Sequence, residues 1–128
     1  NPVAMAAGLA QIGKLKRETA LYDRLGALSK KLTDGLKEIA ASYDTPLQVG
    51  YAGTMFGFFF NANPVSSFAD ALTSDTTLFG RFHSEMLKRG IYLAPSQFEA
   101  GFMCAVMNDE TVKTTLAAAK ESFAAIKG

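Results

Sequence analysis

The chain has 128 residues, enough for one domain with a buried core and too few for two full-sized domains. It is 48% hydrophobic and 20% charged, a globular balance that excludes a disordered or fibrous protein. The net charge of +1 argues against nucleic acid or a membrane surface as a partner. One cysteine and one histidine exclude a disulfide framework and a multi-cysteine or histidine-rich metal centre.

Hydropathy points to the same class of protein. No uninterrupted apolar stretch approaches the roughly 20 residues needed to cross a bilayer, and no signal peptide opens the chain. We therefore expect a soluble protein from a reducing compartment, with a cytoplasmic location.

The first 41 residues predict a long helix. Asn1 and Pro2 are favoured at a helix N-cap and first turn, so the chain opens on a helix start, and we expect a fragment of a longer protein. About 39 helical residues would span about 58 Å, more than the diameter of such a domain. We therefore expect either a break at Gly26 or Gly35, or a helix that runs into another domain. The apolar residues that recur at helical spacing are Met5, Leu9, Ile12, Leu15, Tyr22, Leu25, Leu28, Leu32, Leu36 and Ile39.

Two strands are predicted next. Residues 43–46 form a turn, because Pro46 cannot continue a helix. Residues 47–49 are a short strand candidate, followed by a turn or bulge at 51–53. The run MFGFFF at 55–60 is the strongest strand signal, and its two apolar faces are typical of a strand in a sheet covered on both sides.

The next predicted element is a helix that ends at Arg89. Residues 66–72 stay open between a short helix and a loop. Ser74 or Asp75 then caps a helix that reaches Arg89, and Gly90 ends it in the expected C′ position.

The last segments predict two strands and a helix. Residues 91–93 and 102–106 are strand candidates, and Asn108 or Asp109 caps a final helix to Lys127. The order of elements indicates an α/β (α+β) unit, in which helices back a small sheet.

Few side chains suggest chemistry by themselves. The nine lysines lie in or beside helical patterns with polar faces, which favours solvated lysines over a Schiff-base lysine. His83 lies mid-helix without a carboxylate partner and is interpreted as a surface or interface residue. Cys104 lies in an apolar strand, which favours a core thiol over a nucleophile. The phenylalanines at 56–60 are interpreted as core. Glu99 is, by spacing alone, a plain surface acid.

Three strings resemble a known family: NPVAMAAG at 1–8, GTMFGFF at 53–59, and LKRGIYLAPSQFEAGF at 87–102. Together they resemble the glutamate-1-semialdehyde 2,1-aminomutases, which are class III aminotransferase-like enzymes of the fold-type I pyridoxal 5′-phosphate (PLP) group. The resemblance covers essentially the whole chain, and the segment from Pro95 to Phe102 is its most specific part.

The resemblance implies a carboxy-terminal fragment. Residues 1–26 would be the helix that leaves the large domain, and residues 27–128 the small carboxy-terminal domain, with a short, mostly antiparallel sheet backed by helices. Residues from about Val3 to Gly26 would then pack weakly and expose an apolar stripe. The Schiff-base lysine and the phosphate-binding pair would lie upstream, so no cofactor is expected to bind this segment, which would be inactive alone.

The family also implies a reaction. The full-length enzyme would be a homodimer that uses PLP or pyridoxamine 5′-phosphate to convert the small-molecule substrate (S)-4-amino-5-oxopentanoate to 5-aminolevulinate in tetrapyrrole biosynthesis. The resemblance also makes Glu99 an active-site candidate and not a plain surface acid. It implies no cofactor-binding or metal-binding residue in this segment. The alternative is an autonomous α/β module that binds a metabolite or serves regulation or oligomerisation.

Overall fold

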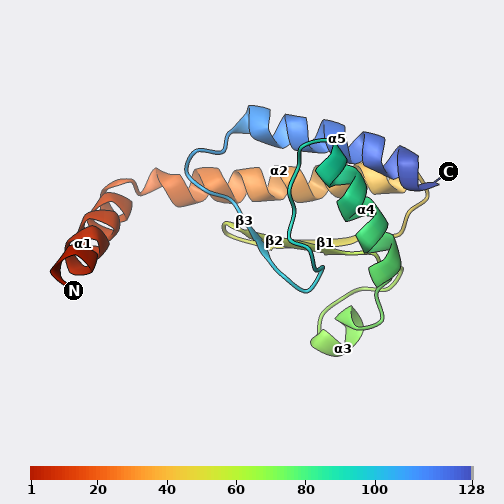
Figure 1. Cartoon of the computed structure of the whole chain (residues 1–128), viewed down its shortest axis with the longest axis horizontal. Coiled ribbons are helices and arrows are strands. Elements are labelled where there is room, and N and C mark those ends of the chain that lie inside the picture. The colour runs from red at the N-terminus through yellow and green to blue at the C-terminus, as the bar shows by residue number, and fades with distance from the viewer. Residues whose placement is uncertain (128) are drawn as a thin grey trace.

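The computed structural model describes residues 1–127. The chain combines helices with a small antiparallel sheet, which confirms the predicted mixed α/β class (Figure 1). The elements are α1 (Pro2–Arg17), α2 (Ala20–Ser42), β1 (Gln48–Ala52), β2 (Met55–Phe59), α3 (Phe68–Ala71), α4 (Thr76–Lys88), β3 (Gly101–Phe102) and α5 (Asp109–Lys127).

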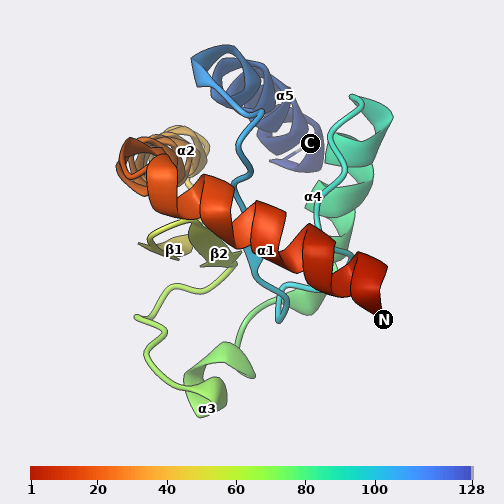
Figure 2. The ribbon, with the colours of Figure 1, turned by 90° about the vertical axis from the view of Figure 1, so that its left-hand side faces the viewer.

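The sheet has three antiparallel strands in the order β1-β2-β3. A two-residue turn, Gly53–Thr54, joins β1 to β2, and Gly53 adopts a φ of +58° that glycine reaches without strain. The short β3 pairs only with the first two residues of β2, Met55 and Phe56. Helices α2 and α5 lie above one face of this sheet, while α3 lies beyond the other face (Figures 1 and 2).

An aromatic cluster forms the core between the sheet and the helices. Phe60 directly follows β2, Phe82 lies on α4 and Phe123 on α5, and all three are at most 2% exposed. The ring centroids of Phe82 and Phe123 are 4.6 Å apart, and those of Phe60 and Phe82 are 5.5 Å apart. The prediction of a phenylalanine core at 56–60 is confirmed for Phe58 and Phe60, which are 7% and 2% exposed, whereas Phe56 and Phe59 are half-buried.

Only one face of the sheet is covered. Phe58 points to the helix side and is buried, whereas Met55 and Phe102 on the opposite face are 41% and 62% exposed. The prediction of a sheet covered on both sides is therefore wrong for the described residues. Apolar residues on both faces of a strand indicate that burial of either face would be favourable. They do not show that residues 1–127 bury both faces.

The long first helix breaks at an unexpected place. It divides at Glu18 and Thr19, while both glycines predicted as break sites lie inside α2. At Gly35 a Cβ atom would come within 2.6 Å of Leu116 on α5, so this glycine serves the close approach of two helices instead of a break. Nothing in the local sequence explains the break at Glu18–Thr19.

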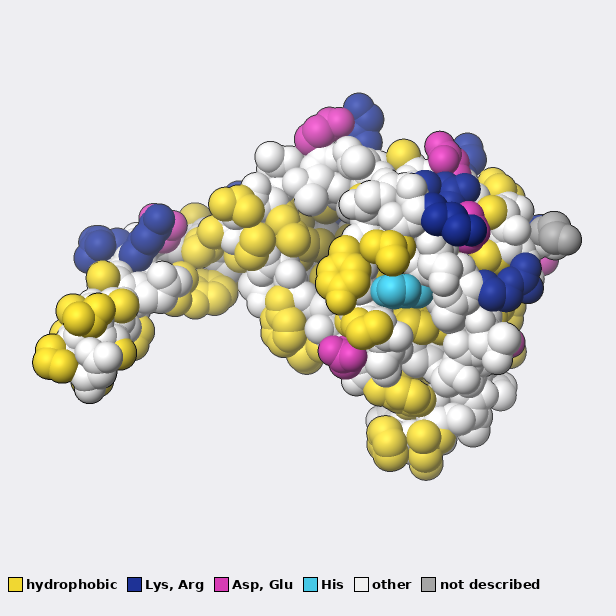
Figure 3. Space-filling model, in the orientation of Figure 1, with side chains coloured by type: hydrophobic (Ala, Val, Ile, Leu, Met, Phe, Trp, Pro, Cys, Tyr) yellow, Lys and Arg dark blue, Asp and Glu magenta, His cyan; other side chains and the backbone are white. Residues whose placement is uncertain are grey.

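α1 extends away from the rest of the chain (Figure 1). None of its residues is buried, and its apolar side chains gather on the surface of the projecting helix at the left of Figure 3. Leu9, for example, is 72% exposed. Burial begins at Leu25 in α2. The division of the chain into residues 1–26 and 27–128 stays a prediction.

Two predicted strands differ in the structure. Residues 91–93 form no strand, and of the stretch 102–106 only Phe102 lies in one, β3. The reason is the length of the hairpin: Phe102 pairs with the first residue of β2, and the next amide, Met103 N–H, donates to the carbonyl of Thr54 in the turn (2.8 Å). Beyond it, no β2 residue remains to pair.

The helix ends agree with their local signals. Asp75 caps α4 by accepting from Leu78 N–H (2.8 Å), and Gly90 follows the helix with a φ of +79°. Asn108 accepts from Thr111 N–H (3.1 Å) at the start of α5. The open segment at 66–72 contains the short α3, capped by Ser67. Within residues 1–127, every helix falls short of the length and apolarity that a membrane span requires.

Candidate functional site

The segment between α4 and β3 carries the sequence string most specific to the resembled family. It has no regular secondary structure before Gly101, so individual hydrogen bonds position it. The amide of Ile91 donates to the carbonyl of Met86 (3.0 Å), and Nε2 of His83 donates to the carbonyl of Leu93 (3.1 Å). His83 is half-buried, with its ring stacked on Phe79 and edge-to-face with Tyr92. It therefore positions this loop from α4. The interpretation of His83 as a surface or interface residue stays a prediction.

A tight turn presents Glu99. The hydroxyl of Ser96 accepts from Phe98 N–H (3.2 Å), and the carbonyl of Ser96 accepts from Glu99 N–H (3.1 Å). Pro95, just before, restricts the backbone further. Glu99 is exposed, and its carboxylate takes part in none of the hydrogen bonds or ion pairs of the described residues. The turn thus fixes the backbone of Glu99, while its exposed carboxylate is available to another molecule.

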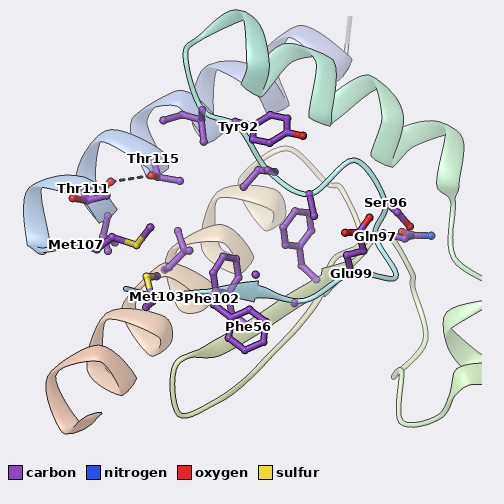
Figure 4. A pocket seen from close by; sticks show the side chains of 18 of the residues that line it. Phe56, Tyr92, Ser96, Gln97, Glu99, Phe102, Met103, Met107, Thr111 and Thr115 are labelled. Carbon is purple, nitrogen blue, oxygen red and sulfur yellow. Dashed lines mark hydrogen bonds between the residues drawn. The ribbon is translucent and has the colours of Figure 1, made fainter. Parts of the chain in front are cut away.

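A cavity of about 320 Å³ opens beside this turn, between the sheet, α4 and α5. Its walls are mainly apolar, with Phe56, Phe79 and Met103 among them. Glu99 is the single charged residue that lines the cavity in the described part of the chain. Figure 4 shows Ser96, Gln97 and Glu99 together at one end, with Met107, Thr111 and Thr115 at the other.

A second, shallower hollow lies on the uncovered face of the sheet. Phe56, Gly57, Gln97 and Glu99 line both this hollow and the cavity. Glu99 thus lies at the junction of the two hollows, at one edge of the sheet. Its assignment to catalysis stays a prediction.

Gln97 has a feature that the sequence did not indicate. It is only 4% exposed, yet neither its amide nitrogen nor its amide oxygen has a hydrogen-bond partner. A buried polar group without a partner costs about 1–3 kcal/mol of stability. Sequence reasoning missed Gln97 because nothing about a glutamine in a loop predicts burial.

A second loop, 104–108, lies at the opposite end of the cavity from this turn. The guanidinium of Arg24 on α2 donates to the carbonyls of Ala105 and Met107, both at 2.8 Å. Cys104 is exposed in this loop, so the prediction of a core thiol is wrong. The cause is the early end of β3, which leaves Cys104 in irregular chain outside the sheet.

The resemblance implies PLP as the cofactor, whose binding requires particular side chains. That cofactor requires a lysine for its aldehyde and cationic or N–H donors for its phosphate. All nine lysines are exposed, as the sequence predicted, and no Lys, Arg or His lines the cavity or the second hollow. No three metal-binding side chains come together within residues 1–127. The described residues therefore do not form a PLP site by themselves.

Comparisons with known proteins agree with the fold. No protein-family model matches the chain. It is similar to an omega-transaminase from Sphaerobacter thermophilus, with 27% identity and a TM-score of 0.83 over 100% of this chain and 29% of that one. A transaminase with PLP bound matches with 20% identity and a TM-score of 0.80 over 98% of this chain and 28% of that one.

A glutamate-1-semialdehyde-aminomutase from Pseudomonas aeruginosa is also similar. Its identity is 18% and its TM-score 0.72, over 83% of this chain and 23% of that one. The chain thus spans less than a third of the length of each of these three enzymes. It has the fold of one part of the fold-type I PLP enzymes, the helix and antiparallel-sheet unit that these transaminases and the aminomutase share.

Proposed function

We propose that this chain is the carboxy-terminal part of a homodimeric PLP-dependent enzyme, and that the whole enzyme converts (S)-4-amino-5-oxopentanoate to 5-aminolevulinate. The observation that carries the proposal is the Pro95–Gly101 turn. Its sequence resembles that of the aminomutases, and its free carboxylate, Glu99, lies at the edge of the sheet between two hollows. The similarity to the aminomutase from Pseudomonas aeruginosa supports the proposal at the level of the fold.

Charge gives Glu99 a physical role in this proposal. A carboxylate repels a second carboxylate within a few ångströms and attracts an ammonium group. Because no cationic side chain of the described residues lines either hollow, residues 1–127 offer a carboxylate-bearing substrate no counter-charge near Glu99. Glu99 would therefore orient the substrate with its amino group toward this turn and its carboxylate away from it.

The test is the substitution Glu99→Gln in the enzyme that contains this chain, with Glu38→Gln as the matched control. Glu38 is an exposed acid on α2 that lines neither hollow. Both variants should change the free energy of unfolding by less than about 0.5 kcal/mol, because neither carboxylate is buried. Turnover of (S)-4-amino-5-oxopentanoate should fall clearly in Glu99→Gln alone. Wild-type kinetics in that variant would remove Glu99 from the site.

A second reaction, transfer of an amino group between two molecules, is favoured by one observation. The omega-transaminase matches over the whole chain with 27% identity, compared with 18% over 83% for the aminomutase. The two reactions differ in their substrates, since the aminomutase reaction needs no second one. Formation of 5-aminolevulinate from (S)-4-amino-5-oxopentanoate alone would support the aminomutase. Turnover only with an amine and a separate oxo acid would support the transaminase.

A further inference from the structure

The carboxamide of Gln97 stands apart from the other polar groups around the cavity. It is the one side chain, among residues 1–127, that is buried and has both polar atoms without a partner. The remaining polar side chains of the cavity wall are used or exposed. At the far end, Thr115 Oγ1 donates to the carbonyl of Thr111 (2.8 Å), and at the near end Ser96 Oγ accepts from Phe98 N–H. Among the buried side chains of residues 1–127, only Gln97 has a hydrogen-bond donor and an acceptor that are both without a partner.

Gln97 lies at the edge of a space that could hold a ligand, with its carboxamide nitrogen turned away from that space in Figure 4. Gln97 lines both the cavity and the second hollow, and Figure 4 places it beside Ser96 and Glu99 at one end of the cavity. The rest of the wall is mainly apolar, with Phe79, Leu93 and Met103 among its residues. Such a site, apolar with a few convergent polar groups, is typical of small-molecule binding.

We propose that Gln97 is a ligand-binding residue whose carboxamide turns from its enclosed position to pair with an uncharged small molecule in the cavity. The ligand would carry an adjacent donor and acceptor, such as a primary carboxamide, on an apolar body. A carboxamide satisfies both atoms of Gln97 with two hydrogen bonds, and the apolar body contacts the phenylalanine and methionine walls. Anions are disfavoured, because among residues 1–127 the acid Glu99 is the one charged residue that lines the wall.

This inference does not depend on the proposed reaction, since it concerns binding by the described chain without any cofactor. Its distinguishing mark is that stability and affinity change in opposite directions. Replacing an unpartnered buried amide by an apolar group removes its desolvation penalty, so the ligand-free chain becomes more stable. The same replacement removes the group that recognises the ligand, so the affinity falls. A glutamine with a purely structural role would show the reverse effect on stability.

The experiment uses the 128-residue chain, with benzamide as the probe and toluene as the matched probe that lacks the carboxamide. The variants are Gln97→Met and Gln97→Leu, which remove the amide at similar size. The control is Gln48→Met: Gln48 lies on β1 and lines the second hollow but not the cavity, and its Nε2 donates to the carbonyl of Asn61 (3.2 Å). Urea denaturation gives the unfolding midpoints, and NMR titration of the backbone amides gives the affinities.

We expect benzamide to bind the wild-type chain and to shift the amide signals of the cavity wall. Gln97→Met should weaken benzamide binding about fivefold or more, and should leave toluene binding unchanged or tighter. The ligand-free unfolding midpoint should stay level or rise in Gln97→Met or Gln97→Leu. Gln48→Met should bind benzamide as the wild type does.

Three outcomes would overturn the inference. They are no binding of benzamide to the wild-type chain at millimolar concentration, equal benzamide affinity in wild type and Gln97→Met, and a lower unfolding midpoint in both Gln97 variants. None of these outcomes bears on turnover by the longer enzyme, so the proposed function would be tested separately.

Discussion

The first and last helices of the chain have similar local signals and different environments. α1 and α5 both carry apolar residues at helical spacing and basic residues in the last turn, yet α1 buries none of its residues. α5 buries Val112, Ala118, Ala119, Ser122, Phe123 and Ile126 against α2 and α4. An apolar stripe predicts a helix, but only a facing surface converts that stripe into stability.

The largest expected effect is the loss of a ring from the core. Phe82→Ala should lower the free energy of unfolding by about 3–5 kcal/mol, since Phe82 is 0% exposed and contacts three other rings. The matched control is Phe68→Ala, whose ring is 70% exposed and should cost much less. Urea denaturation measures both. Equal losses would contradict the placement of the core.

A smaller loss of stability is expected where β3 packs closely against β2. A Cβ atom at Gly101 would lie 2.3 Å from the ring of Phe56, so Gly101→Ala should cost about 1–3 kcal/mol of unfolding free energy. Gly57→Ala is the control, because a Cβ there meets nothing within 4 Å. If the two variants unfold at the same urea concentration, β3 does not pack on β2 as described.

Two helix caps test the comparison directly. Asp75 caps the packed helix α4, and Asp75→Ala should cost about 1 kcal/mol of unfolding free energy. Asn1 caps the exposed helix α1 by accepting from Val3 N–H (3.0 Å), and Asn1→Ala should leave the global unfolding midpoint unchanged. Loss of α1 helicity, measured by NMR chemical shifts, should accompany only the second change. A global effect of Asn1→Ala would show that α1 is packed.

The acid of the short helix α3 gives a pH-dependent prediction. Hydrogen bonds from the backbone N–H of Ser66 and the hydroxyl of Ser67 lower the pKa of Asp70 below its usual value. Because the folded pKa lies below the unfolded one, this contribution to stability is present above the unfolded pKa and is lost as pH falls through the folded pKa. Ser67→Ala should raise the NMR titration midpoint of Asp70. An unchanged midpoint would show that the Ser67 hydroxyl does not stabilise the carboxylate.

The smallest effect is expected on α1. Leu9→Ala should change the free energy of unfolding by less than about 0.5 kcal/mol, since Leu9 is 72% exposed. The same leucine-to-alanine change at Leu36 on α2, which is 3% exposed, should cost several times more. Size-exclusion chromatography of the wild type checks whether the apolar stripe of α1 promotes self-association. A large loss in Leu9→Ala would mean that a partner surface covers α1.

Much of the candidate site could be found from the sequence, and the rest depended on packing. The resemblance of the string at 95–102 identified Glu99 as a candidate, and the structure places it at the junction of two hollows. The burial of Gln97, two residues earlier, has no signal in the sequence, because it depends on how the loop folds against the sheet. The contact of Arg24 with the loop at 105–107 joins residues about eighty positions apart and was equally invisible.

Local signals along the chain were sufficient for the helices, the hairpin and the mixed fold class. Asp75, Gly53 and Gly90 act through their own backbone or that of nearby residues, and so their effects can be predicted without the fold. Contacts between distant residues decided the other features. The early end of β3 and the single covered face of the sheet each depend on which surfaces meet. No such contact explains the break in the first helix, because α1 buries none of its residues. The hydrophobic effect is non-directional, so an apolar residue in the sequence predicts burial but does not predict which surface buries it.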